Sequence, residues 1–170
     1  MNEIHPRVVA SINVGVEWQC RRHAEQTTPI RSPQDFADAL GYDAHRIAKT
    51  VLLGNSRLSS AQRLTQPFGN YLAACLPAPC RIDFSKLACR AGWPRCELAT
   101  RDELKAILGY PVGGVSPFGL GDVPLFIDHS LMEFETVLVG AGTVGVEIEI
   151  TPLQLLQIDK AKQDAIAVLT

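Results

Sequence analysis

The sequence predicts a single compact α/β domain that spans residues 1–170. A chain of this length can bury one sizeable core, and no low-complexity tract or long linker divides it. Hydrophobic residues make up 46% of the chain and charged residues 20%, which is the composition of an ordered globular protein. Short apolar runs rich in β-branched residues alternate with segments that carry helix-start signals. This interleaving of strands and helices predicts a mixed α/β architecture.

Helix signals occur in five segments. Residues 6–13 are consistent with a short helix. Ser32 and Pro33 are typical of a helix start and Gly41 of a helix end, because glycine readily adopts the positive φ that follows a last turn. The other helices are expected after Asp83, from the capping pair Thr100 and Glu103 to Gly109, and after Thr151-Pro152.

Strand signals occur in six short apolar segments that contain β-branched residues. The expected strands are Val16–His23, Arg46–Leu53, Tyr71–Leu76, Leu125–Asp128, Thr136–Val139 and Val146–Ile150. Residues 54–68 are polar, and we expect them to form a connection or a hairpin tip.

The charge and hydropathy of the chain argue against two classes of protein. With a formal net charge of -2, the chain lacks the broad basic face of proteins that coat nucleic acid, although a small local contact stays open. No apolar run approaches the roughly 18 residues of a membrane span, and the opening residues MNEIHPR lack the apolar stretch of a secretory signal. We therefore expect a cytoplasmic protein with no membrane partner. The sequence does not indicate the oligomeric state.

The cysteines are odd in number, and several lie in apolar or helical surroundings, where a reduced thiol behaves as a small hydrophobic group. Zinc sites usually bring cysteines in two close pairs. The gaps from Cys75 to Cys96 are four, eight and six residues, which form no such pairs. We expect reduced, structural cysteines and no metal at Cys20, Cys75, Cys80, Cys89 and Cys96.

The segment Gly140-Ala141-Gly142-Thr143-Val144-Gly145 matches the GxGxxG pattern of dinucleotide-binding turns. Such a turn must open a helix whose N-terminus receives the pyrophosphate. Here the alternating run VEIEI follows and predicts another strand. The context therefore favours a glycine-rich hairpin.

A more informative segment is GYPVGGVSPFG, from Gly109 to Gly119, because its four glycines and two prolines leave little room for regular structure. Glycines let main-chain amides approach a ligand closely, while prolines favour one preorganised shape. The segment therefore favours a binding loop, with a tight crossover between core elements as the alternative.

Two charged residues interrupt or end apolar strands. Lys49 lies within IAKTVLL, so its side chain must either reach the surface or face a polar cavity. Asp128 ends the strand PLFID, where a turn or a helix cap is the alternative to a role in a site.

In that order, the strand IAKTVLL, the loop GYPVGGVSPFG, the strand VPLFID and the GAG turn resemble the YbaK/ProX (YbaK/EbsC) family of aminoacyl-tRNA deacylases. That family includes free-standing editing proteins and the editing insertion of bacterial prolyl-tRNA synthetases, and the resemblance covers residues 16–158. It implies a mixed, mainly antiparallel and partly barrel-like sheet with surrounding helices. It also implies a trans-editing hydrolase for mischarged Cys-, Ala-, Ser- or Thr-tRNA, with tRNA(Pro) as the expected acceptor.

The resemblance further implies the residues of the site. Lys49 matches the family's substrate-site lysine and is the candidate catalytic residue, and Gly113 to Pro117 match its GxxxP loop. Relatives of the cysteine-specific branch often carry a tyrosine shortly before a histidine, whereas this chain has Arg21-Arg22-His23, so the edited amino acid stays open. The candidate substrate-binding residues are Gly113, Gly114, Val115, Ser116, Pro117, Phe118, Gly119, Asp128, Thr50, His23, Gly140 and Gly142.

Hydrolysis of an aminoacyl ester needs a positioned nucleophile and stabilisation of an oxyanion, but no cofactor. We expect main-chain amides of Gly113–Gly119 to bind the ester and Lys49 to orient the substrate. Water attacks, or the thiol of a cysteinyl substrate attacks in its place. Ser116 is not assigned as nucleophile, because its GVSPFG context differs from the GxSxG elbow.

The expected partners are the acceptor end of aminoacyl-tRNA and, as a candidate, prolyl-tRNA synthetase. Two alternatives stay open. One is a non-catalytic module that binds aminoacyl-tRNA or a small ligand, and the other is a hydrolase of another activated acyl ester.

Overall fold

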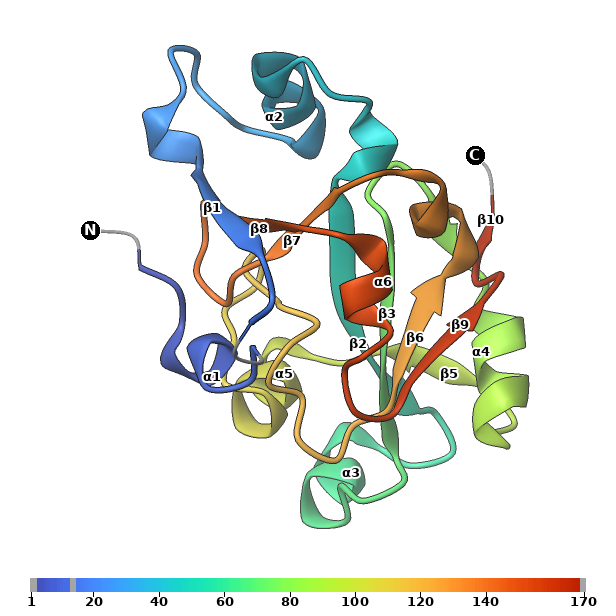
Figure 1. Ribbon diagram of the computed structural model, residues 1–170. Helices are drawn as coiled ribbons and strands as arrows, with labels where there is room; N and C mark the ends of the chain where they lie inside the picture. The colour runs from blue at the N-terminus through green and yellow to red at the C-terminus, as the bar shows by residue number, and fades with distance from the viewer. Residues whose placement is uncertain (1–2, 13–14, 169–170) are drawn as a thin grey trace.

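The computed structural model describes residues 3–12 and 15–168, which form six α-helices and ten strands joined by loops and three short 3-10 helices (Figure 1). The helices are α1 (Pro6–Val9), α2 (Pro33–Leu40), α3 (Ser60–Thr65), α4 (Phe84–Ala91), α5 (Arg101–Ile107) and α6 (Pro152–Leu155). The strands are β1 (Trp18–Arg22), β2 (Ala48–Asn55), β3 (Tyr71–Pro77), β4 (Arg81–Ile82), β5 (Cys96–Leu98), β6 (Leu125–Asp128), β7 (Val137–Gly140), β8 (Val146–Ile150), β9 (Ala161–Asp164) and β10 (Ala167–Val168). The 3-10 helices are η1 (His23–Glu25), η2 (Ala44–Arg46) and η3 (His129–Glu133). None of the helices in these ranges has the length and hydropathy that a bilayer span requires.

The largest sheet has five strands in the order β5-β2-β3-β6-β9. The long strand β2 runs antiparallel to both of its neighbours, β3 and β5. Strand β6 is parallel to β3 and to β9, so the sheet is mixed. The partnership of β5 with β2 covers only Leu53–Asn55, which leaves the first half of β2 without β5 beside it.

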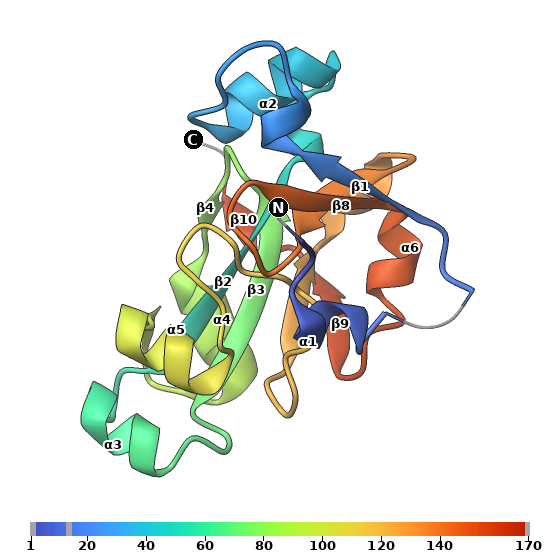
Figure 2. The ribbon, with the colours of Figure 1, turned by 90° about the vertical axis from the view of Figure 1, so that its left-hand side faces the viewer.

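A second sheet, in the order β1-β8-β7, is antiparallel throughout. A single parallel bridge between Ile47 and Leu138 joins β7 to the start of β2, so the two sheets meet along one edge. Figure 2 shows the small sheet beside the upper end of the large one. Strands β4 and β10 form a separate two-stranded pair. Five of the seven strand pairings among the described residues are antiparallel, which confirms the predicted mixed and mainly antiparallel fold.

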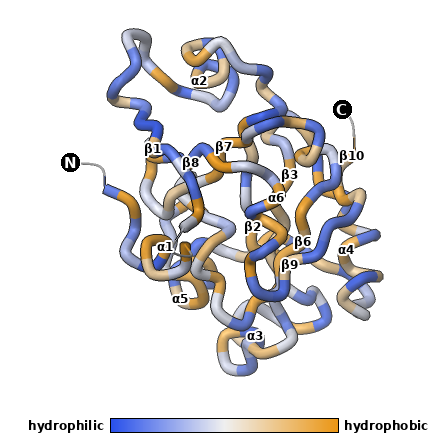
Figure 3. Tube along the Cα trace, viewed as in Figure 1, coloured by the Kyte–Doolittle hydropathy of each residue, from blue (hydrophilic) through white to orange (hydrophobic). Residues whose placement is uncertain are grey.

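Apolar side chains pack on both faces of the five-stranded sheet. Between the two sheets, Leu52 and Leu125 pack in one cluster with Val139 and Ile148. On the opposite face, the side chains of Leu53, Leu72, Leu76 and Phe126 form a second cluster with Leu87 of α4. Hydrophobic colours accordingly follow the central strands (Figure 3). Since the side chains of a strand alternate between faces, each residue of β2 is assigned to one of these two environments.

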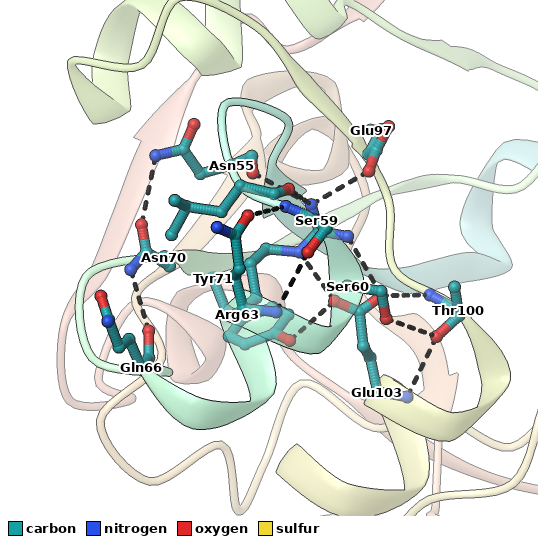
Figure 4. A network of polar contacts seen from close by, with 12 residues as sticks. Asn55, Ser59, Ser60, Arg63, Gln66, Asn70, Tyr71, Glu97, Thr100 and Glu103 are labelled. Atoms are coloured by element: carbon teal, nitrogen blue, oxygen red, sulfur yellow. Dashed lines mark hydrogen bonds and ion pairs between the residues drawn. The ribbon is translucent and has the colours of Figure 1, made fainter.

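A buried polar network fastens α3 and α5 to the large sheet (Figure 4). The guanidinium of Arg63, which is 1% exposed, donates from Nε to Glu103 Oε1 over 2.7 Å and from Nη2 to Oε2 over 3.2 Å. The Tyr71 hydroxyl and the Thr100 main-chain N–H each donate to the same carboxylate over 2.7 Å. Burial raises the pKa of Glu103, but these hydrogen bonds outweigh burial and hold it at about 2, so the carboxylate is ionised at neutral pH.

The same guanidinium also donates hydrogen bonds to main-chain carbonyls at the end of β2 and in the turn that follows. Its Nη1 lies 3.0 Å from Asn55 O and 2.7 Å from Leu58 O, and it reaches the partly exposed Glu97 at 3.0 Å. Gly54 makes room for this arrangement, since a Cβ at that position would lie 2.5 Å from Arg63 Nε. Arg63 therefore connects α3 to α5 and to the strands β2 and β5.

Several predicted elements agree with the structure in detail. Strands β6 and β8 span the predicted residues. Helix α2 begins after Ser32, whose Oγ accepts from the Asp35 N–H over 3.1 Å, and ends at Gly41 with φ 69°. Helix α5 begins with the predicted capping box of Thr100 and Glu103.

Other boundaries were predicted wrongly. The connection over residues 54–68 contains helix α3, which begins with its own capping box, Ser59 and Gln62. The helix after Thr151 is one short turn, and β9 and β10 follow it. Strands β4, β5 and β10 are two or three residues long and depend on partners distant in sequence, so no local pattern predicts them.

The ends of three more elements shift. Helix α1 stops at Val9, and the predicted last residue, 13, lies outside the described residues. His23 begins η1 after β1 has ended, and Arg46 closes η2 before β2 begins.

Candidate active site

The glycine-rich segment from Gly109 to Gly119 forms one closed loop between α5 and β6. Tyr110 is 2% exposed, and its hydroxyl donates to Phe118 O over 2.5 Å, which ties the two ends of the loop together. Burial raises the pKa of Tyr110 to about 12, so the hydroxyl keeps its proton and stays a donor. Inside the loop, Ser116 is fully buried and its Oγ accepts from the Phe118 N–H over 3.2 Å. The loop is therefore held in one shape, as its composition predicted.

This loop packs directly on the hairpin that joins β7 to β8. The hairpin carries the GxGxxG segment and is followed by a strand, which confirms the hairpin prediction. A Cβ at Gly140 would lie only 2.1 Å from Val115 O, and one at Gly114 would lie 2.9 Å from the main chain of Thr143 and Val144. Gly142 has φ 79°, and a Cβ there would meet the side chain of His5 at 2.4 Å. Gly114 and Gly140 thus permit main chain to touch main chain, and Gly142 leaves room for the side chain of His5.

A small cavity of about 190 Å³ lies between the GxxxP loop and β2. Its lining is mostly apolar and comes from three places: β2, the segment from β5 into α5, and the loop. The lining side chains and main-chain atoms include those of Thr50, Leu52, Leu98, Ala99, Leu104, Val112, Gly113 and Val115. Three of the predicted substrate-binding residues, Thr50, Gly113 and Val115, therefore lie together in this lining.

Thr50 is the polar side chain of this lining. It is 6% exposed, and no group within the described ranges makes a hydrogen bond of full geometry with its Oγ1. Its neighbour is the thiol of Cys75, a weak partner whose pKa burial raises to about 12 in spite of the contact with Thr50. Because a neutral thiol forms only weak hydrogen bonds, the Thr50 hydroxyl has no strong hydrogen-bond partner among the described residues.

Lys49 lies on the opposite face of β2 from Thr50, because successive side chains of a strand alternate. Its ammonium donates to two main-chain carbonyls of the turn after β3, Ala78 O at 3.0 Å and Cys80 O at 2.6 Å. Burial lowers the pKa of Lys49 from its ordinary value. Lys49 is not among the side chains that line the cavity, although it directly precedes Thr50. Its ammonium holds the turn after β3 and keeps one N–H donor for another partner.

Comparison with known proteins identifies the family. Residues 27–158 match the family model of the aminoacyl-tRNA editing domain, which is more than half of the chain. The chain belongs to the aminoacyl-tRNA editing domain family.

Individual relatives of this editing domain agree with the assignment. EbsC of Enterococcus faecalis, named provisionally as a Cys-tRNA(Pro)/Cys-tRNA(Cys) deacylase, is 30% identical over 129 residues, which cover 75% of this chain and 71% of EbsC. The proline–tRNA ligase of Staphylococcus aureus is 24% identical over 123 residues, which cover 72% of this chain and 20% of the ligase. A solved structure described provisionally as a trans-editing enzyme for prolyl-tRNA synthetase has a TM-score of 0.72 at 20% identity, and the match covers 89% and 87% of the two chains. The predicted resemblance to the YbaK/EbsC family is confirmed.

The other predicted substrate-binding residues are not part of the cavity lining: Gly114 and Ser116 to Gly119 belong to the loop, Gly140 and Gly142 belong to the hairpin, and Asp128 and His23 lie elsewhere. The carboxylate of Asp128 is 1% exposed and accepts from the main-chain N–H groups of Ile166 and Ala167 at 2.8 and 2.9 Å. It also accepts from the N–H and hydroxyl of Ser130, so it caps η3 and anchors the last strand. This geometry matches the capping alternative for Asp128.

His23 lies at the far end of the hairpin. Its N–H donates to Gly145 O over 2.9 Å, and its ring packs on Phe36 with 4.3 Å between centroids. Its Nε2 is 3.5 Å from Glu147 Oε1. The structure thus connects His23 to the hairpin and leaves it outside the cavity lining.

The sequence missed one wall of the cavity. Leu98, Ala99 and Leu104 lie there because β5 pairs with β2 and because Arg63 fixes the first turn of α5. No motif marks these apolar residues, and β5 itself has no local signal. In residues 3–12 and 15–168, no group of three or more His, Cys, Asp or Glu side chains is placed to hold a metal ion, and all five cysteines are free thiols.

Gly140→Ala is expected to damage the site through the contact with Val115. The new Cβ cannot share the space of Val115 O, so the loop or the hairpin must move, at a cost of about 1–3 kcal/mol in stability. A shift of about 1 Å in a positioning element lowers turnover by about 100-fold. The measurement is the deacylation rate together with the melting temperature. Gly41→Ala is the matched control, since a Cβ there meets nothing within 4 Å and only the positive φ is strained. Equal rates in the two variants would contradict the role given to the Gly140 contact.

Proposed function

We propose that this editing domain is a hydrolase that removes the aminoacyl group from mischarged tRNA, and that the cavity between β2 and the GxxxP loop holds that group. The observation that carries the proposal is the preorganised loop, which closes a small apolar cavity against β2 in a chain of the editing-domain family. A cavity of about 190 Å³ suits a small aminoacyl group, while the body of the tRNA stays outside. The name of EbsC supports a Cys-charged tRNA, and the match to proline–tRNA ligase supports tRNA(Pro) as the acceptor. We include Ala, Ser and Thr in the proposed substrate class because their side chains are small, like that of Cys.

The reaction we propose is a direct hydrolysis. The oxygen of water bonds to the ester carbonyl carbon, the bond from that carbon to the ribose oxygen breaks, and the ribose hydroxyl leaves with a proton that water supplied. Main-chain N–H groups around the cavity stabilise the oxyanion. Ser116 does not act as nucleophile, because its side chain is fully buried and its Oγ supports the loop. Lys49 orients the acceptor end through its remaining N–H donor and its charge, which a phosphate can meet.

A limited contact with tRNA agrees with the charge of the chain. The formal net charge of -2 provides no broad basic face, so the proposed footprint is the unpaired acceptor end. Prolyl-tRNA synthetase is the proposed partner in the sense that its mischarged product is the substrate. Editing of this kind is needed because a synthetase pocket discriminates a missing methylene by only about 10–200-fold.

The test is a panel of tRNA(Pro) charged with Ala, Cys, Ser, Thr or Pro, in which the loss of the ester is followed with time. Wild-type protein is expected to release at least one mischarged amino acid and to spare Pro-tRNA(Pro). Ser116→Ala is expected to keep turnover. Loss of turnover in this variant, together with an acyl-enzyme that accumulates on the wild type, would overturn direct attack by water. Binding without release from any member of the panel would replace the hydrolase by a binding module. Equal rates on free aminoacyl esters would point to another acyl ester as the substrate, since a tRNA editor depends on remote contacts.

A further inference from the structure

The outer edge of β2 has a gap between two neighbouring strands. At its start, β7 reaches β2 through the bridge between Leu138 and Ile47. Further along, Ala99 N donates to Leu52 O over 2.9 Å, and β5 pairs from Leu53 onward. Thr50 lies between these two contacts, where no described strand covers the edge.

The hydrogen-bond pattern shows which way the main chain of Thr50 faces. In an antiparallel ladder, the N–H and C=O of one residue point to the same side, and successive residues alternate. The odd-numbered residues face β3, since Ile47 O accepts from Ala78 N at 2.7 Å and Asn55 N donates to Asn70 O at 3.0 Å. Leu52, an even-numbered residue, faces outward to Ala99. Thr50 therefore directs its N–H and C=O outward, into the gap.

This gap opens into the cavity described above. Thr50 and Leu52 line the cavity from β2, and Gly113 and Val115 face them from the GxxxP loop. Main-chain N–H and C=O groups in a largely apolar pocket need a partner, because an unpaired buried group costs about as much as a lost hydrogen bond. An aminoacyl ester carries the complementary pair, an ammonium donor and a carbonyl acceptor on adjacent atoms.

We propose that the aminoacyl group binds as a one-residue continuation of the sheet, in which the Thr50 N–H donates to the ester carbonyl and the Thr50 C=O accepts from the α-ammonium. Residues paired across an antiparallel ladder place their side chains on the same face. The amino-acid side chain therefore points to the face of Thr50, toward Leu104 and Val115, and the ester carbonyl receives a donor that strengthens as the oxyanion forms. This binding mode rests on the proposed function and makes Thr50 a catalytic residue through its main chain.

The test replaces the Thr50 N–H by an ester oxygen, through incorporation of the α-hydroxy analogue of threonine at position 50, which keeps the side chain. The expected result is a fall in kcat of about 100- to 1000-fold with a nearly unchanged melting temperature. The matched control is the α-hydroxy analogue of leucine at Leu53, whose main chain faces β3 and which does not line the cavity. That variant is expected to melt at a lower temperature and to keep its kcat. An unchanged kcat of the Thr50 variant on a tRNA that wild type deacylates would overturn the inference and leave the hydrolase proposal intact.

A second measurement does not depend on turnover. A non-hydrolysable analogue, in which an amide joins alanine to the 3′ carbon of adenosine, is added to ¹⁵N-labelled wild-type protein. The amide proton of Thr50 is expected to move downfield and to become protected from exchange, while that of Leu53 stays unchanged. Saturable binding without a change at Thr50 would overturn the inference. A change at Thr50 in a protein that releases no amino acid from the panel would uphold the binding mode and defeat the hydrolase proposal.

Discussion

Lys49→Ala is expected to lower the deacylation rate by about 100-fold. Lys49 directly precedes Thr50, and its ammonium connects β2 to the carbonyls of Ala78 and Cys80. We propose that the charge of this ammonium binds the acceptor end of the tRNA. Loss of these charge-assisted hydrogen bonds is also expected to cost about 1–3 kcal/mol in stability. The measurement is single-turnover deacylation of the substrate that the tRNA(Pro) panel identifies.

The control for Lys49 is Lys162→Ala, which removes an exposed lysine of β9 and changes the net charge equally. Its rate is expected to match wild type. Lys49→Arg keeps the charge but not the compact ammonium, so an intermediate rate is expected. Wild-type turnover by a folded Lys49→Ala protein would remove Lys49 from the mechanism.

Glu103→Gln is expected to lower stability by about 3–5 kcal/mol, because it leaves the buried Arg63 charge without its ionised partner. For a domain of this size, the loss corresponds to a fall of about 10 °C in melting temperature. Glu97→Gln removes an exposed partner of the same guanidinium and is expected to cost about 0–1 kcal/mol. Thermal unfolding of wild type, Glu103→Gln and Glu97→Gln measures both effects. Equal melting temperatures for the two variants would refute the larger contribution that we assign to the buried ion pair.

The same carboxylate predicts the pH dependence of stability. The pKa of Glu103 is about 2 in the folded protein and near 4.3 in an unfolded chain, so its contribution is fully present above about pH 4.5. That contribution is lost as the pH falls toward 2. The stability difference between wild type and Glu103→Gln should therefore shrink over this acidic range, and a constant difference would show that the charge of Glu103 is not its source.

The elements that sequence predicted well are those whose signals are local. Strand β8 is an alternating run between a glycine-rich turn and Thr151, and α5 carries a complete capping box, so both could be located from a few neighbouring residues. Helix α3 shows the limit of this approach. Its capping box, Ser59 and Gln62, is equally local, but the polar composition around it favours a connection, and the buried role of Arg63 depends on Glu103 forty residues later.

For the candidate site, the sequence singled out the loop and Thr50 but not the wall that Leu98, Ala99 and Leu104 form. Leu98 and Leu104 have no unusual chemistry, and their place in the cavity follows from pairing between β5 and β2. The sequence marked Lys49 as exceptional because it is charged within an apolar strand. Which carbonyls hold it depends on the turn after β3, and that turn is a property of the folded chain.

The parallel pairing of β3 with β6 has a consequence for how the site assembles. Strands β2 and β3 are close in sequence and can associate early, because the loop to be closed is short. Ala73 meets Leu125 only after the chain has crossed over through α4, β5, α5 and the GxxxP loop. Two parts of the cavity lining belong to that crossover: the segment from β5 into α5 and the GxxxP loop. During refolding, the pair of strands β2 and β3 should therefore form first. The ability to bind ligand should appear in the slowest phase, when β3 pairs with β6.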